Sequence, residues 1–271
     1  MTPPAVDREW LRALRAAAIQ APLRPRVPLW AGESVIGSVE PDFLHQIALQ
    51  PMADGRHPLL KEERPGRLGW RLMGDVTTSL NRVAAALHEA GLAGAWRNEQ
   101  LAVPDQLGHR KGTVERAAVR PLGITTLAVH LVGQAPDGRF WVQQRAFDKA
   151  NDPGLWDTLM GGMVSAADTV ETALARETWE EAGLHVADLQ AMRYGGRLTI
   201  CGPSSDGQGA GYVNENIDWY GCTVPEGLAP HNQDGEVVQF ALMDSGQLLQ
   251  AMQQGDFTLE AGLILSEVMG L

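Results

Sequence analysis

The first third of the chain alternates short apolar runs with polar turns, which indicates a mixed α/β structure. Val27–Trp30 and Ser34–Gly37 flank the turn-forming residues Ala31-Gly32-Glu33 and predict a hairpin. Thr77–Ala90 carries apolar residues at three- and four-residue spacing and stops before Gly91, so it predicts a helix. The remaining expected elements are two short helices and a loop between them: Pro41–Gln50, Thr113–Val119 and Pro104–Arg110.

The pattern changes near Leu122, where dense β-type runs begin. Ile124–Val132 and Phe140–Gln144 predict two strands joined by a turn at Pro136-Asp137-Gly138. Thr169–Ala182 is the clearest helix of the chain. Two more strands, a helix and two loops are expected at Ile217–Val224, Val237–Leu242, Ser245–Gln254, Ala146–Leu155 and Pro203–Gly211, the last rich in Gly and Ser and expected to be mobile. We therefore expect two α/β domains, residues 1–121 and 122–271.

The composition excludes several classes of function. The 271 residues carry a formal net charge of −11 and no cluster of Lys and Arg, which argues against a nucleic-acid partner. No apolar run is long enough to span a membrane, so no membrane association is expected. Cys201 and Cys222 form no metal-type pair, which favours a reducing cytoplasm, although the two cysteines could lie close together in the fold.

Three acids stand out on the helix predicted over Thr169–Ala182. Glu177, Glu180 and Glu181 stand at positions i, i+3 and i+4 and therefore share one face. Apolar side chains project on the same side of the helix, so the acids extend its apolar face instead of opposing it. Three half-buried carboxylates repel one another and lose hydration, and Mg²⁺ or Mn²⁺ would offset both costs. The alternative is an acidic face in contact with solvent.

The longer string around these acids resembles the Nudix box, which reads Gly, five residues, Glu, seven residues, Arg-Glu-apolar-x-Glu-Glu-x-Gly-apolar. The matching residues are Gly162, Arg176, Glu177, Glu180, Glu181, Gly183 and Leu184. The resemblance implies an α/β/α sandwich with a mixed sheet, here preceded by a small α/β domain. It also implies that a divalent metal ion assists hydrolysis of a diphosphate bond in a small molecule.

The resemblance further implies roles for individual residues. The carbonyl group of Gly161 and the side chains of Glu177 and Glu181 would hold metal, with Glu180 joining when more than one ion binds. Arg176 belongs to the catalytic set. Another acid from a later loop often assists the metal or acts as the base in this family.

The leading candidate for that later acid is Glu236, whose alternative is an exposed acid in a turn. Arg145 follows a predicted strand and would bind phosphate, or else form a surface ion pair. Trp156 would stack on a substrate ring, or else pack in the core. His130 alternates within an apolar strand and is expected to be a buried histidine with satisfied hydrogen bonds.

Two positions depart from the Nudix pattern. Asp168 stands where the family has Glu, and Thr178 stands where it has an aliphatic residue. Asp168 either supports Arg176 or caps the helix in a box with Glu171, and Thr169 is a rival cap. At the other end of the helix, Gly183 followed by Leu184 is typical of a helix C-terminus.

Segments outside the box resemble one branch of the family, the proteins with an extra N-terminal domain related to the region fused to thiamin pyrophosphokinase. These segments are Trp96–Glu99, Glu115–Ala118, Gly123-Ile124, Ala128–His130, Pro153–Asp157 and Asp234–Val237. The resemblance implies thiamin diphosphate or its oxidised forms as substrate, cut to the monophosphate and phosphate. ADP-ribose-like compounds and oxidised nucleoside diphosphates are the alternative substrates, and a non-catalytic ligand-binding protein is the alternative class.

The N-terminal region is expected to help select the organic part of the substrate, because ligand sites favour domain interfaces. Its alternative roles are to cover an exposed surface or to form a homodimer.

Overall fold

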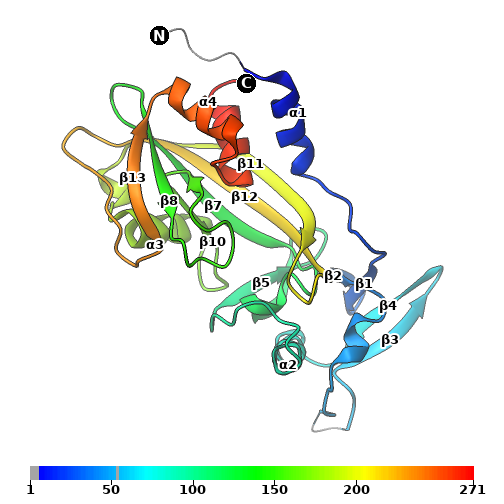
Figure 1. Ribbon diagram of the computed structural model, residues 1–271. Coiled ribbons are helices and arrows are strands. Elements are labelled where there is room, and N and C mark those ends of the chain that lie inside the picture. The colour runs from blue at the N-terminus through cyan, green and yellow to red at the C-terminus, as the bar shows by residue number, and fades with distance from the viewer. Residues whose placement is uncertain (1–5, 53–54) are drawn as a thin grey trace.

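The computed structural model describes residues 6–52 and 55–271. Its larger part is built on a seven-stranded mixed sheet in the order β11-β12-β7-β8-β13, with β10 paired to β7 and β9 paired to β8 (Figure 1). The strands are β7 Thr126–Gln134, β8 Phe140–Arg145, β9 Trp156–Asp157, β10 Met160–Met163, β11 Gln190–Ser204, β12 Gly211–Thr223 and β13 Val237–Met243.

Helices cover both faces of this sheet. On one face α3 (Val170–Ala182) packs against β7 and β10, around a core that includes Val129, Leu159 and Leu174. On the other face lie α1, α4 and α5, around a second core (Figure 1). Their bounds are Arg8–Ala17, Ser245–Gln254 and Leu259–Val268. This arrangement confirms the predicted α/β/α sandwich.

The first third of the chain forms a smaller sheet with its own core. Its strand order is β2-β1-β4-β3, and a separate β5-β6 hairpin and one helix, α2, complete it. The elements are β1 Val27–Ala31, β2 Ser34–Val39, β3 Leu59–Arg64, β4 Arg67–Leu72, α2 Val76–Glu89, β5 Gln100–Pro104 and β6 Arg110–Glu115. The predicted β1-β2 hairpin and the α2 helix are confirmed, and a small α/β region does precede the sandwich.

Two helices predicted in this region are wrong. Of Pro41–Gln50 only the 3-10 turn Phe43–Gln46 is helical. Thr113–Val119 is split between the end of β6 and the 3-10 turn Arg116–Ala118. Helices this short have little stability of their own, so pairing of β6 with β5 decides the backbone conformation instead.

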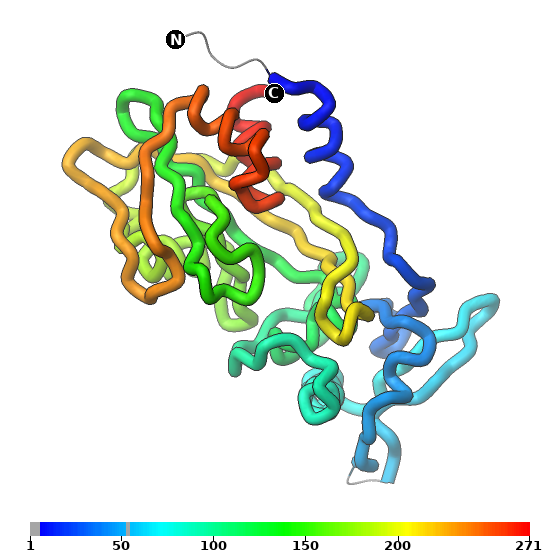
Figure 2. Tube along the Cα trace, in the orientation of Figure 1, coloured from blue at the N-terminus to red at the C-terminus, as the bar shows by residue number. Residues whose placement is uncertain are grey.

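A long hairpin links the two parts of the molecule. Strands β11 and β12 run toward the first third of the chain, and their tip lies against it (Figure 2). There the amide of Tyr212 donates to the carbonyl of Arg120 over 2.9 Å, and Arg26 Nη1 donates to the carbonyl of Ala210 over 2.6 Å. The loop predicted over Pro203–Gly211 is therefore shorter than expected, because the strands extend to Ser204 and resume at Gly211.

Both cysteines are free: Cys222 is buried and Cys201 half-buried. Within the described ranges 6–52 and 55–271, no helix combines the length and the apolar character needed to cross a bilayer.

Candidate active site

Helix α3 carries the acids of the site, and its two ends are fixed by local interactions. Thr169 is the N-cap: its side chain accepts from the amide of Thr172, whose own hydroxyl accepts from the amide of Thr169. The alternative in which Asp168 caps the helix in a box with Glu171 is therefore wrong, and the rival cap Thr169 is confirmed. Gly183 ends the helix with a φ of 60°, the left-handed conformation that glycine adopts without strain.

Thr178 occupies the position where the Nudix pattern has an aliphatic residue. Its side chain is fully buried, and its hydroxyl donates to the carbonyl of Leu174 over 2.6 Å. The hydroxyl is thus satisfied within the helix, and the position remains compatible with the core.

Arg176 joins the loop before α3 to two of its acids. Its guanidinium donates to Asp168 Oδ2 from Nε over 3.1 Å and from Nη2 over 2.9 Å. Nη1 lies 3.0 Å from Glu177 Oε1 and 2.9 Å from Glu180 Oε2. The shorter side chain of Asp168 therefore still reaches Arg176, and this network sets the orientation of Glu177 and Glu180.

Glu181 is the most buried acid of the helix, with a side chain 3% exposed. Its Oε2 accepts from Gln143 Nε2 over 2.8 Å and from the amide of Gly161 over 3.1 Å. Its Oε1 lies 3.7 Å from Lys149 Nζ. Burial raises the pKa of Glu181 to about 7, because it outweighs the favourable effects of Lys149 and the two hydrogen bonds.

The pKa of Glu177 is raised by burial, as is that of Glu181. Burial raises its pKa to about 7, and the charges of Glu180 and Glu99 act in the same direction, against the attraction of Arg176. Gly162 on β10 makes room for this side chain, since a Cβ atom there would overlap with the carboxyl group of Glu177. The motif glycine therefore lets the strand pack close to the acid, and a larger residue there would displace the carboxyl group of Glu177.

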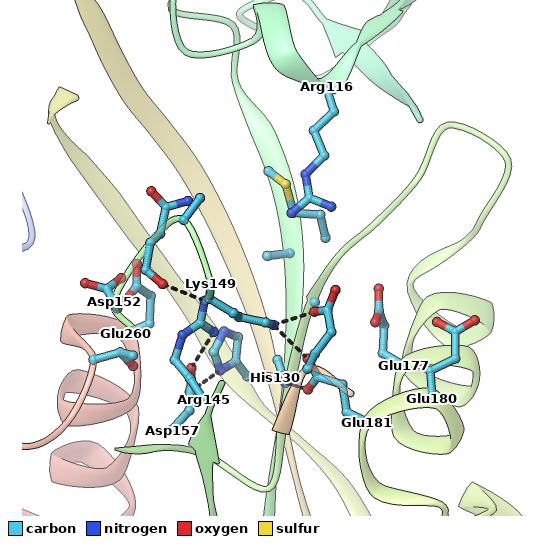
Figure 3. Close-up of a pocket in the computed structure, with 18 of the residues that line it drawn as sticks. Arg116, His130, Arg145, Lys149, Asp152, Asp157, Glu177, Glu180, Glu181 and Glu260 are labelled. Carbon is cyan, nitrogen blue, oxygen red and sulfur yellow. Dashed lines mark hydrogen bonds and ion pairs between the residues drawn. The ribbon is translucent and has the colours of Figure 1, made fainter. Parts of the chain in front are cut away.

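The acids of α3 form one wall of a cavity of about 450 Å³. Figure 3 shows Glu177, Glu180 and Glu181 on one side of this space, with Lys149 extending toward them from the other. Lys149 contacts both Glu181 and Glu236. Burial favours the neutral form of Glu236, but the hydrogen bond and charge of Lys149 outweigh it and lower the pKa of Glu236.

Arg145 on β8 and His130 on β7 line the same cavity. Arg145 Nη1 lies 3.4 Å from Asp157 Oδ2, and Nη2 donates to the carbonyl of Asn151 over 3.1 Å. The ring of His130 is buried, and its Nδ1 lies 3.0 Å from the hydroxyl of Thr158. Burial lowers the pKa of His130, so it stays neutral at physiological pH.

Trp156 lies elsewhere. Its side chain packs against the core formed with α4 and α5, and its backbone pairs with Phe257. Among the described residues, the lining of the cavity does not include Trp156. The structure therefore gives this residue a packing position and brings Arg145, Gly161, Glu236 and the α3 acids together without it.

Several lining residues were not found from the sequence. They include Lys149, Asp157 and Glu260 in the sandwich, and Arg97, Glu99 and Arg116 in the first third of the chain. Arg97, Glu99, Arg116 and Asp157 lie in segments that resemble the branch with an extra N-terminal domain, but nothing local to those segments marks them as site residues. The fold brings all six to the cavity.

The donor set can be compared with the needs of a divalent ion. Over the described part of the chain, no three His, Cys, Asp or Glu side chains already surround one point as a metal would need, and the acids of the cavity pair with Arg176 and Lys149 instead. Yet Glu177 and Glu181 present hard oxygen ligands at the cavity wall, where burial raises the pKa of both carboxyl groups. These residues fit Mg²⁺ or Mn²⁺.

The sandwich and its helix of carboxylates have the arrangement that the Nudix box predicts. Residues 125–261, just over half of the chain, match the NUDIX domain family. The chain therefore belongs to this family.

Two curated relatives from Arabidopsis thaliana resemble most of the chain. Nudix hydrolase 20, chloroplastic, is 28% identical over 193 residues, which cover 68% of this chain and 49% of the relative. Nudix hydrolase 24, chloroplastic, is 28% identical over 191 residues, which cover 67% of this chain and 50% of the relative. The chain thus spans about half the length of these relatives. Among solved structures, DR0079 from Deinococcus radiodurans is 20% identical with a TM-score of 0.48, covering 62% of this chain and 98% of that one.

Proposed function

We propose that this chain hydrolyses a diphosphate bond in a small organic molecule with the aid of Mg²⁺ or Mn²⁺. The observation that carries the proposal is a pair of carboxylates at the wall of a cavity, buried Glu181 and partly buried Glu177, whose pKa values are both raised to about 7. Burying two carboxylates near each other is unfavourable unless a cation compensates them. A purely structural role gives no reason to keep them there.

The residues of the cavity would have separate roles in the reaction. Glu177 and Glu181, with Glu180 and the carbonyl of Gly161, would hold the ion, which supplies positive charge to phosphate oxygens and lowers the pKa of water. Lys149 and Arg145 would donate hydrogen bonds to phosphate. Glu236 has a lowered pKa, so it is ionised at neutral pH and can accept a proton from water.

For the organic part we propose a thiamin-diphosphate-like compound, in line with the branch that the chain resembles. A second group of acids supports this choice at the far end of the cavity, where Glu260 lies near Asp157, Glu215 and Asp152 (Figure 3). Burial raises the pKa of Glu260 to about 7, and the charges of these three neighbours add to that shift. A cationic ring would find favourable electrostatics there. Residues 1–121 would act as an accessory domain that contributes to the walls.

The test is release of phosphate or a monophosphate from a panel of diphosphates: thiamin diphosphate, oxidised thiamin diphosphate, ADP-ribose and oxidised nucleoside diphosphates. We expect turnover that depends on Mg²⁺ or Mn²⁺ and stops with EDTA. We also expect a kcat/KM at least about tenfold higher for the thiamin compounds than for nucleotides, which corresponds to about 1.4 kcal/mol in the transition state.

The hydrolase activity and the choice of substrate are tested by different outcomes. A tenfold preference for a nucleotide would overturn the thiamin-like substrate and leave the hydrolase proposal intact. Binding of panel compounds without any turnover, at saturating metal, would overturn the hydrolase proposal and favour a ligand-binding protein.

A further inference from the structure

Four charged side chains from outside the matched family region line the cavity: Arg120 and three that lie together. Arg97, Glu99 and Arg116 all line it, although the family match begins only at residue 125. They cluster at one end of the β5-β6 hairpin, where Gln100 pairs with Glu115 and the amide of Arg116 donates to the carbonyl of Glu99 over 2.8 Å. Figure 3 shows Arg116 entering the space from the side opposite Glu181, toward Lys149 and Glu177.

The end of this hairpin is fixed from within the N-terminal region. Asn81 on α2 donates to the carbonyl of Thr113 over 3.2 Å and to Gln100 Oε1 over 3.0 Å. Glu115, 1% exposed, accepts from the amide of Arg97 over 2.9 Å. The side chains at the hairpin end therefore start from a rigid backbone.

The same hairpin is also fixed to the loop that precedes α3. The amide of Ala166 donates to the carbonyl of Gln100 over 2.7 Å, and Arg110 Nη1 donates to the carbonyl of Ala166 over 2.8 Å. Leu101 forms a β-bridge with Ser165. This pairing sets the distance between the hairpin end and the carboxylates that α3 presents.

The hairpin end and the α3 acids line the same cavity, so their charges act on one another. The charges of Arg97 and Arg116 lower the pKa of Glu236, and the charge of Glu99 raises that of Glu177. The hairpin end therefore lies within Coulomb range of both acids.

Most cations of the cavity already have partners, and those at the hairpin end have the fewest. Arg176 is held by three acids, and Arg145 and Lys149 each contact acids. Arg116 Nη1 is 2.7 Å from Glu99 Oε2, and within residues 6–52 and 55–271 Glu99 is the side-chain partner of Arg116. In the same ranges Arg97 donates from its backbone amide to Glu115, and its side chain forms no hydrogen bond or ion pair. Both guanidinium groups therefore keep donors available to the cavity.

We propose that Arg116, assisted by Arg97, forms an anion subsite that binds a phosphate group of the substrate opposite the α3 acids. Glu99 orients Arg116 as a positioning residue. A guanidinium group can bind phosphate through two parallel hydrogen bonds, and the 38% exposed side chain of Arg116 can rearrange its pairing with Glu99 at little cost. The inference rests on the proposed function and extends it: the region before the sandwich supplies part of the active site.

The experiment measures binding of inorganic diphosphate with Mg²⁺ by calorimetry, and kcat and KM on the diphosphate panel, for the full chain. Arg116→Ala should weaken diphosphate binding about 10- to 100-fold, as expected for loss of charge-assisted hydrogen bonds, and raise KM more than it lowers kcat. Arg116→Lys should recover part of the affinity, because it keeps the charge and loses the paired geometry. Arg139→Ala, which removes an arginine paired with Asp137 in an exposed turn, is the matched control and should behave like the wild type.

The outcomes separate this inference from the proposed function. Wild-type affinity in folded Arg116→Ala would overturn the subsite, as would a wild-type chain that binds no diphosphate. Should Arg116→Ala fail to fold, Arg116→Lys decides, and unchanged affinity and KM in that variant would overturn the subsite. Diphosphate binding that depends on Arg116 without turnover of any panel compound would uphold the subsite and overturn the hydrolase.

Discussion

Replacing Glu181 with Gln tests the central claim that a buried carboxylate is kept at a cost to stability. In the metal-free protein, burial raises the pKa of Glu181 to about 7, against roughly 4.3 in an unfolded chain. Between these values the folded chain holds the proton more tightly, so the free energy of unfolding falls as the pH rises. At about 1.4 kcal/mol per pKa unit, the carboxylate destabilises the fold by about 4 kcal/mol above pH 7.

The Gln side chain removes this cost with little loss of contacts. Both hydrogen bonds to Glu181, from Gln143 and from the amide of Gly161, end on the same oxygen, which an amide oxygen can replace. The attraction to Lys149 is lost, and this reduces the gain. We expect Glu181→Gln to be more stable by about 2–3 kcal/mol at pH 8, and by less than about 1 kcal/mol at pH 5, where the wild-type carboxyl group is protonated.

The assay is calorimetric unfolding in EDTA at both pH values, where the gain at pH 8 corresponds to about 5 °C. Glu171→Gln on the exposed side of the same helix is the control and should show no gain. With Mg²⁺, we expect kcat of Glu181→Gln to fall by about 100-fold or more, because a metal ligand is lost. The reasoning is refuted if the variant is destabilised equally at both pH values, or if its turnover is near normal at saturating metal.

Three further changes test other parts of the site. Asp168→Ala should lower the stability by about 1 kcal/mol and kcat by about tenfold, because Arg176 loses its two hydrogen bonds to Asp168. Asp168→Glu should stay active. Denaturant unfolding and steady-state kinetics measure both effects, and an inactive but folded Asp168→Glu would contradict the supporting role of Asp168. Gly162→Ala should reduce kcat at least about tenfold in a folded protein, since its Cβ displaces Glu177; unchanged kcat with a native circular dichroism spectrum would contradict this. Trp156→Ala should lower the free energy of unfolding by about 2–4 kcal/mol, because it leaves a cavity in the core. It should leave the ratio of kcat/KM for thiamin diphosphate to kcat/KM for ADP-ribose unchanged. A tenfold change in that ratio would place Trp156 at the substrate.

The sequence by itself determined the features that depend on neighbours a few residues apart. Helical spacing places Glu177, Glu180 and Glu181 on one face whatever the rest of the chain does. The stop at Gly183 and the α4 helix at Ser245–Gln254 follow equally from local capping rules. The Nudix pattern is visible for the same reason, since its residues lie within one loop and one helix.

Only the tertiary structure decided which other side chains meet these acids. Gln143 lies 38 residues before Glu181 yet donates to it, because the sheet that contains β8 packs against α3, and no local pattern marks such a pair. Sheet pairing also overrode local preference in Thr113–Val119, which turned a predicted helix into the strand that positions Arg116. The choice between core and substrate for Trp156 depended on where α5 packs. Long-range contacts form where packing brings strands and helices together, and their partners carry no fixed spacing that a sequence could reveal.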